Sequence, residues 1–158
     1  GDESAILIKT LLLDKGGEET TNTEIPIDQP CRLGMEFRIK IANGERFVPT
    51  FHFYTGDGVR AFITTPVIAI PQSEGRYRTL VTIPPNFLND GPYSVKFTLH
   101  GVPPGRSWTI ENLIFEKQSA LLLNIIDDVH NNPRRNGRAQ GIPGSVRPEL
   151  PWSIEQRQ

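Results

Sequence analysis

The sequence contains one cysteine, Cys31, among its 158 residues, which excludes a disulfide bond within the chain. A single domain of this size buries roughly 70% of the surface that its unfolded form exposes, so its core needs no covalent staple. The chain is therefore suited to a reducing compartment.

Long hydrophobic runs are also missing. The two longest, "AILIKTLLL" at 5–13 and "ALLLNII" at 120–126, fall short of the roughly 20 residues that a spanning helix needs. We therefore expect no direct membrane insertion. The opening "GDES" has no signal pattern, and its glycine in place of methionine leads us to expect a piece of a longer polypeptide.

Neither sign of charge dominates, since 17 lysines and arginines face 18 acidic residues, for a formal net charge of −1. This balance argues against a protein that coats nucleic acid or anionic membrane. The late arginines at 134, 135, 138 and 147 lack interleaved aromatic residues, so we expect no nucleic-acid partner. They are solvated, meet another domain, or contact an anionic sugar.

Catalytic motifs are absent as well, because the chain has no phosphate loop, no G-x-S-x-G elbow and no H-E-x-x-H helix. Asp128 and His130 stand two residues apart, but a metal needs three or four ligands and no third one is supplied by spacing. We expect no catalytic residues, no metal and no cofactor. An enzyme that acts through two carboxylates across a cleft, as glycan-acting enzymes do, stays open as an alternative, since sequence cannot show such a pair.

The sequence does have a strong two-residue alternation. In "PYSVKFTLHG" the residues Tyr93, Val95, Phe97 and Leu99 share one side of a strand. The stretch "CRLGMEFRIKIANG" at 31–44 alternates in the same way, and so does "VPTFHFYTGDG" at 48–58 until its glycine turn. Each of these segments predicts one apolar and one polar face.

Further strands are predicted at 5–14, 60–64, 77–83 and 107–117, while "PPNFLND" at 84–90 is compatible with a single helical turn. No run of ten or more residues has the helical period. This pattern is typical of an all-β, antiparallel β-sandwich of immunoglobulin-like or jelly-roll type. We expect one domain over 1–158, with the main sandwich at about 5–128.

The end of the chain, at about 129–158, has a different character. It is loop-like, with a short extended piece near 145–152 that carries leucine and Trp152. Because these apolar side chains are poorly placed in water, we expect the tail to dock on this molecule or on a second copy. Trp108 and Trp152 are interpreted as core or interface anchors.

The order of these segments is similar to that of a known family. The early "LLLDKGG", the alternating "LGMEFRIKI", the segment "PTFHFYTGDGVRAF", the stretch "IPPNFLNDGPYSV" and the closing "GSVRPELPW" carry the resemblance. From about Ala5 to Trp152 the chain resembles the carboxy-terminal carbohydrate-binding domain of Wzt, the nucleotide-binding subunit of ABC transporters that export O-antigen polysaccharide.

The resemblance implies a β-sandwich that dimerises by exchanging its carboxy-terminal strand, here through Val146, Leu150 and Trp152. It implies recognition of O-antigen polysaccharide at its non-reducing end, in the cytoplasm beneath the inner-membrane transporter. The parent ATPase domain, which uses ATP and Mg²⁺, and the membrane subunit of the transporter are implied as partners. ATP hydrolysis would belong to that other domain.

Sugars are bound by aromatic rings and by side chains that hydrogen-bond to hydroxyl groups, and two predicted strands present such residues on their polar sides. If these strands are neighbours, we expect one carbohydrate-binding surface, which the charged side of the segment at 31–41 would extend. Its expected residues are His52, Tyr54, Lys96, Thr98, His100, Arg38 and Lys40. The alternatives are an ordinary solvated face and a β-sandwich that only dimerises or docks a protein partner.

Overall fold

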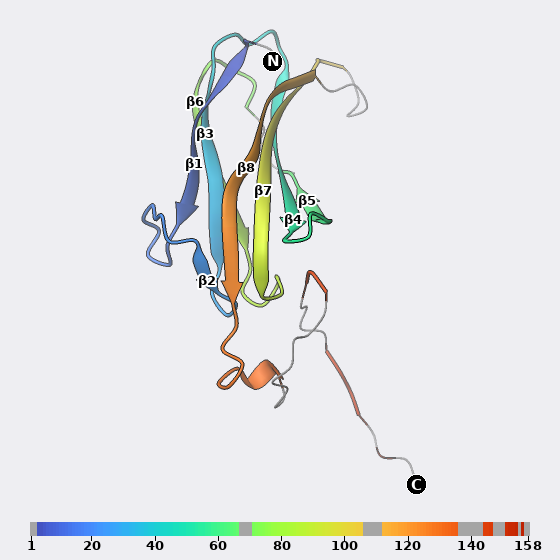
Figure 1. Ribbon diagram of the computed structural model, residues 1–158. Coiled ribbons are helices and arrows are strands. Elements are labelled where there is room, and N and C mark those ends of the chain that lie inside the picture. The colour runs from blue at the N-terminus through green and yellow to red at the C-terminus, as the bar shows by residue number, and fades with distance from the viewer. Residues whose placement is uncertain are drawn as a thin grey trace.

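The computed structural model describes residues 3–66, 71–105, 112–135, 144–146, 151–154 and 156. These residues form eight β-strands and one 3-10 helix, and the predicted all-β sandwich is confirmed (Figure 1). The elements are β1 (Ala5–Leu13), β2 (Glu24–Pro26), β3 (Cys31–Ile39), β4 (Arg46–Thr55), β5 (Arg60–Thr64), β6 (Gly75–Ile83), β7 (Gly91–Val102), β8 (Asn112–Ile126) and η1 (Pro133–Arg135).

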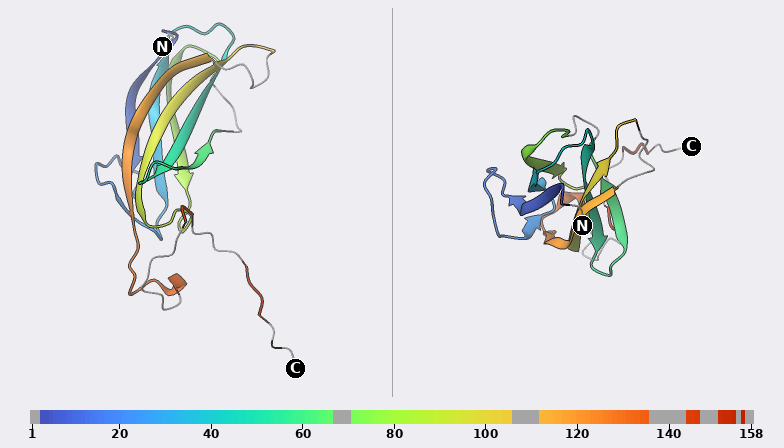
Figure 2. Two further views of the ribbon diagram at one scale, coloured as in Figure 1. Left: turned by 45° about the vertical axis from the view of Figure 1, so that its right-hand side comes forward. Right: turned by 90° about the horizontal axis from the view of Figure 1, so that it is seen from above.

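The strands form two sheets that pack face to face (Figures 1 and 2). The small sheet has the order β1-β3-β6, and the large sheet has the order β2-β8-β7-β4-β5. All neighbouring strands are antiparallel except β2 and β8, which are parallel. Strands far apart in the sequence are thus side by side, as β4 and β7 show.

The core lies between the sheets and follows the period of two. On β3 the side chains of Leu33, Met35 and Phe37 point inward and are fully buried, and Phe53 and Phe97 meet them from β4 and β7. Alternate positions of a strand point to opposite faces, so the remaining residues of each strand form the outer surface. This separation fixes which side chains remain available to a ligand.

Two predictions about elements need correction, and one short strand was missed. The strand predicted to end at Lys117 continues to Ile126, because "ALLLNII" carries on the pairing with β7. The short strand β2 was not predicted, and it exists because it pairs with the end of β8. The stretch at 84–90 forms a turn followed by the isolated bridge between Leu88 and Val146, and not a helical turn. Trp108 lies outside the described residues.

The chain leaves β8 through a compact loop. The Arg135 guanidinium donates to the Asp127 carboxylate, with 2.7 Å between Nε and Oδ2, and both side chains are almost completely buried. Asn132 donates to the other oxygen of Asp127 at 2.7 Å. This buried pair fixes the loop against the end of the sandwich. Over the described ranges, we find no helix of the length and apolar character that crossing a membrane requires.

Candidate functional site

The outer side of β4 and β7 brings five of the predicted site residues together. The two strands are antiparallel neighbours, with His52 opposite Lys96, Thr50 opposite Thr98 and Val48 opposite His100. The condition for a shared surface is therefore met, because the two strands are neighbours in the large sheet. We call the outer side formed by His52, Tyr54, Lys96, Thr98 and His100 the polar face, in which Thr98 itself is buried, at 2% exposure.

His52 is the central residue of the polar face. Its Nε2 lies 3.4 Å from the Thr98 hydroxyl oxygen, whereas its Nδ1 is buried and has no hydrogen-bond partner in the described part of the chain. Burial, together with the positive charges of Lys96 and Arg60, lowers the pKa of His52 to about 4. At neutral pH the ring is uncharged and carries an unused polar atom, although such atoms are costly when unpaired.

Tyr54 is held by a residue from the neighbouring strand. A bulge at Ala61 shifts the register of β5 so that Arg60 lies opposite Tyr54. The guanidinium carbon is 5.7 Å from the ring centroid, and Arg60 donates to the Tyr54 hydroxyl at 3.4 Å. This hydrogen bond lowers the pKa of Tyr54. The ring is thereby fixed beside a cation at one end of the polar face.

Lys96 lies opposite a second irregularity, because residues 118–120 of β8 bulge where β7 has Lys96 alone. Ser119 within this bulge has a φ of 44°. The Lys96 side chain is only 16% exposed, and its Nζ lies 3.8 Å from a carboxylate oxygen of Glu116. The face therefore combines a neutral imidazole, a phenol ring, hydroxyl groups and cations within one curved sheet.

Arg38 and Lys40 do not extend the polar face, and that expectation is wrong. Arg38 lies on β3 in the small sheet, and Lys40 follows the end of the same strand. The two sheets are separate layers, so the outward residues of β3 point away from the opposite side of the sandwich. Periodicity predicted that they face outward, but not in which sheet they lie.

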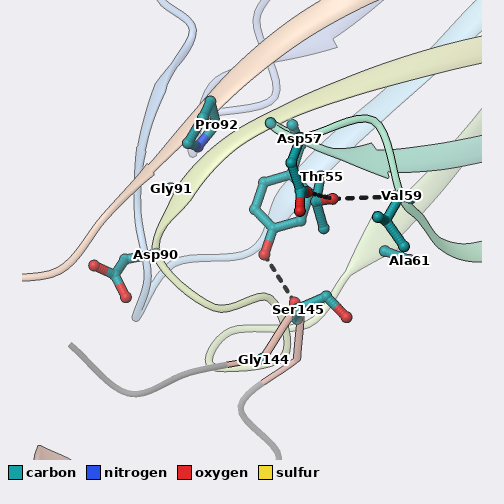
Figure 3. Close-up of a pocket in the computed structure, with 11 residues that line it drawn as sticks. Thr55, Asp57, Val59, Ala61, Asp90, Gly91, Pro92, Gly144 and Ser145 are labelled. Carbon is teal, nitrogen blue, oxygen red and sulfur yellow. Dashed lines mark hydrogen bonds between the residues drawn. The ribbon is translucent and has the colours of Figure 1, made fainter.

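A pocket of about 390 Å³ lies at the end of the sandwich where β4 passes into β5 (Figure 3). Its polar lining includes Thr55, Asp57 and Asp90, and Tyr93 and Pro92 supply apolar surface. The Thr55 hydroxyl donates to the Asp57 carboxylate, which lowers the pKa of Asp57. The sequence analysis did not predict this pocket. The turn at 56–58 was the one local signal near it, and the other lining residues come from distant segments.

Part of the tail closes this pocket, since Gly144 and Ser145 line it as well. The Tyr93 hydroxyl donates to the Ser145 carbonyl at 2.8 Å, and Asn89 Nδ2 donates to the Gly144 carbonyl at 2.6 Å. Val146 forms the bridge to Leu88. The expectation that the tail docks is thus realised for these three residues within the same chain.

The other predicted tail contacts differ in their outcome. Leu150 lies outside the described residues. Trp152 is 87% exposed, so within this single chain it does not act as a core anchor.

No cluster of three or more metal-ligating side chains occurs within the ranges described above. Asp128 is engaged by its own turn, because its carboxylate accepts hydrogen bonds from the backbone of His130 and from Asn131. These bonds lower the pKa of Asp128. The short "DDVH" stretch thus stabilises a turn.

The polar face and the pocket together offer hydrogen-bond donors and acceptors beside an aromatic ring and a proline. Such a combination suits a ligand that is rich in hydroxyl groups and has apolar C–H faces. The polar side chains are positioned by neighbouring strands and by two bulges.

No family model matches this sequence, and no curated protein matches it by sequence comparison. The structure is similar to a crystal structure of the C-terminal domain of Wzt, with a TM-score of 0.72, 13% identity, and coverage of 98% of this chain and 86% of that one. An immunoglobulin-like protein from Pseudomonas aeruginosa matches with a TM-score of 0.40 and 13% identity, over 77% of this chain and 96% of that one. The chain has the fold of the Wzt C-terminal domain.

Proposed function

We propose that this chain is a non-catalytic carbohydrate-binding domain that recognises O-antigen polysaccharide for export by an ABC transporter. The observation that carries this proposal is the polar face, where five predicted residues meet on a sheet whose fold is that of the Wzt C-terminal domain. On this proposal the domain works at the cytoplasmic side of the inner membrane. Its partners are the polysaccharide, the parent ATPase domain and the membrane subunit.

The His52 ring supports a ligand at this face, because it is partly exposed, uncharged at neutral pH and flanked by the Thr98 hydroxyl. Tyr54 offers its ring to a C–H face of the sugar. The pocket near Thr55 and Asp57 is large enough for a terminal sugar residue by the usual range of ligand pockets. We propose that the chain end enters there while the preceding sugars cross the polar face.

A weak affinity for a single site is expected. Four or five hydrogen bonds that contribute about 1 kcal/mol each, less the cost of association, correspond to a dissociation constant on the order of 0.1 to 1 mM. Tethering to a transporter or pairing of two sites raises the effective concentration. Binding must therefore be measured at millimolar ligand.

The test is a screen of purified O-polysaccharides of different structure, followed by NMR titration of the labelled domain with each one that binds. We expect saturable shifts at residues of β4 and β7. Trimming the non-reducing end of the bound polysaccharide should remove the shifts around the pocket. If no O-polysaccharide causes shifts at millimolar concentration, the domain is a structural or protein-docking module, and turnover of a polysaccharide would instead indicate an enzyme.

His52→Ala and Tyr54→Ala are each expected to weaken binding about fivefold to thirtyfold, since each removes contacts worth about 1–2 kcal/mol. Affinity is measured by the same NMR titration. Lys117→Ala, an exposed change on β8, serves as the matched control and should leave the affinity unchanged. Unchanged affinity in both site variants would reject the polar face as the binding surface.

We also propose that two copies form a dimer by exchanging their tails, through Val146, Leu150 and Trp152. The bridge between Val146 and Leu88 supports this, because the same contact can form between chains if the connecting loop reaches the neighbour. A chain that ends at residue 143 should sediment as a monomer at concentrations where the full chain is dimeric. A dimer that persists in the shortened chain would contradict exchange of the tail.

A further inference from the structure

The outer face of the small sheet carries a concentration of arginine side chains. Among the described residues of β3, Arg32, Glu36 and Arg38 point to this side. On β6, Arg78 lies opposite Glu36 and Arg76 lies opposite Arg38. On β1, Lys9 lies opposite Glu36. We call the surface of Lys9, Arg32, Arg38, Arg76 and Arg78 the arginine face. Glu19 and Glu36 are the described carboxylates that pair with it, which leaves three positive charges in excess.

This excess contrasts with the whole chain, which has a formal net charge of −1. The charges are therefore segregated, and this layer is positive while the remainder of the protein is acidic on balance. A one-signed field on one face attracts a partner of the opposite sign and speeds their association.

Glu36 holds two of these guanidinium groups in place. Its carboxylate accepts from Arg78 Nε at 2.9 Å and from Arg76 Nε at 3.2 Å, and the side chain is only 6% exposed. The Arg76 side chain remains 64% exposed and that of Arg78 48%, so each presents further N–H groups to solvent. Because their orientation is already fixed, less conformational entropy is lost when they bind another carboxylate.

Arg38 is the most informative member of the face. It lies directly opposite Arg76, and like charges in this position destabilise a sheet. Within the described ranges no ion pair is formed by Arg38 to offset this repulsion. On its other side lies Ile6, which is 42% exposed. This end of the face thus combines uncompensated positive charge with exposed aliphatic surface.

We propose that the arginine face is a docking surface for a protein partner that presents an acidic patch. Arginine, and not lysine, dominates this face, and arginine is enriched at protein interfaces where its planar fork binds carboxylates in a bidentate manner. Membrane-surface segments favour inserted aromatic residues, and the outward positions of these three strands include none among the described residues. The surface lies on the layer opposite the polar face and does not depend on glycan binding.

The experiment uses a fluorescein-labelled peptide of ten glutamates as the probe and the full chain as the receptor. Fluorescence anisotropy at low salt should show binding, and a peptide of ten glutamines should show none. NMR shifts caused by the glutamate peptide should map to β3 and β6. Arg38→Glu should weaken binding about tenfold, and Arg38→Ala by about threefold, because they reverse or remove one interface charge.

Lys117→Glu changes the charge by the same amount on the large sheet, and binding should stay within about twofold of the unchanged chain. The urea unfolding midpoint of each variant is first compared with that of the unchanged chain. If Arg38→Glu lowers this midpoint, the binding comparison uses Arg38→Ala instead. Equal losses from Lys117→Glu, or shifts confined to the polar face, would overturn the proposal. Binding to phosphatidylglycerol vesicles without binding to the peptide would overturn it too, in favour of a lipid surface.

Discussion

His52 and Glu36 show how single side chains on the two outer faces are adapted to different environments. Burial and neighbouring cations lower the pKa of His52 to about 4, which keeps its ring neutral. Hydrogen bonds from Arg76 and Arg78 lower the pKa of Glu36 to about 2, which keeps its carboxylate charged. The first residue is left with unused bonding capacity, whereas the second is saturated by its partners.

For His52 we predict a titration midpoint near pH 4 in an NMR titration of the imidazole nitrogens. The unfolded ring takes up a proton near pH 6.5 and the folded ring does not, so the free energy of unfolding should fall as the pH drops from 6.5 toward 4. In His52→Gln this part of the pH dependence should be missing. A midpoint above 6 would mean that the ring is not shielded.

Glu36 should also make the free energy of unfolding fall as the pH drops, although it is an acid whose charged form is stabilised by cations. Its pKa is lowered in the folded state, so its stabilising contribution is complete above about pH 4.5 and is lost as the pH falls toward 2. Glu36→Gln should therefore lower the urea midpoint at pH 7, and the difference from the unchanged chain should shrink below pH 4.5. Urea unfolding at several pH values gives both numbers. A difference that is constant with pH would contradict the ion-pair explanation.

Sequence patterns predicted the direction of individual side chains well and their neighbours only in part. The alternation in "FHFYT" and "YSVKFTLH" placed His52, Tyr54, Lys96, Thr98 and His100 on the polar side of their strands, and pairing of β4 with β7 then brought them together. Arg38 obeys the same alternation but belongs to the other layer. Strand order depends on long-range packing, and the two-residue alternation within a strand carries no information about it.

At the scale of elements, β3 and β6 approach each other closely at Gly34. A Cβ atom added there would lie 1.8 Å from the carbonyl oxygen of Thr79, which is backbone and cannot turn aside. Glycine is thus required by contact rather than by its dihedral angles. The pairing of the small sheet depends on this one absent side chain.

Gly34→Ala is therefore expected to destabilise the fold by about 3 kcal/mol, at the upper end of the usual cost of overpacking. The measurement is the free energy of unfolding in urea. Gly16→Ala, in the turn after β1, is the matched control, because an added Cβ atom would lie 3.3 Å from its nearest neighbour, Asp14 Oδ1, and not against backbone. A loss from Gly34→Ala no larger than that of the control would show that the two strands can separate without cost.

Element boundaries were harder to predict than element types. The strand predicted to end at 117 continues to Ile126, because the residues after the bulge at 118–120 pair with β7 again. Likewise β2 is three residues long and exists only through its parallel pairing with β8. Neither feature has a local signal in the sequence, since both are produced by the partner strand.

At the scale of the whole molecule, the tail is joined to the sandwich by a small set of polar contacts. Tyr93→Phe removes the hydroxyl that bonds to the Ser145 and Asn89 carbonyls while keeping the ring in the core. We expect a loss of about 1 kcal/mol and faster amide exchange around Val146. Hydrogen exchange followed by mass spectrometry measures the second effect. Exchange that stays as slow as in the unchanged chain would show that the tail is held elsewhere.

Asn89 and Tyr93 hold residues 144–146 by hydrogen bonds to the main-chain carbonyls of Gly144 and Ser145. No described hydrogen bond reaches the Ser145 side chain. Gly144, with a φ of 109°, is the position that tolerates no other residue easily. Because both bonds go to backbone oxygens, any segment that follows this backbone path with glycine in that place can accept the same two bonds.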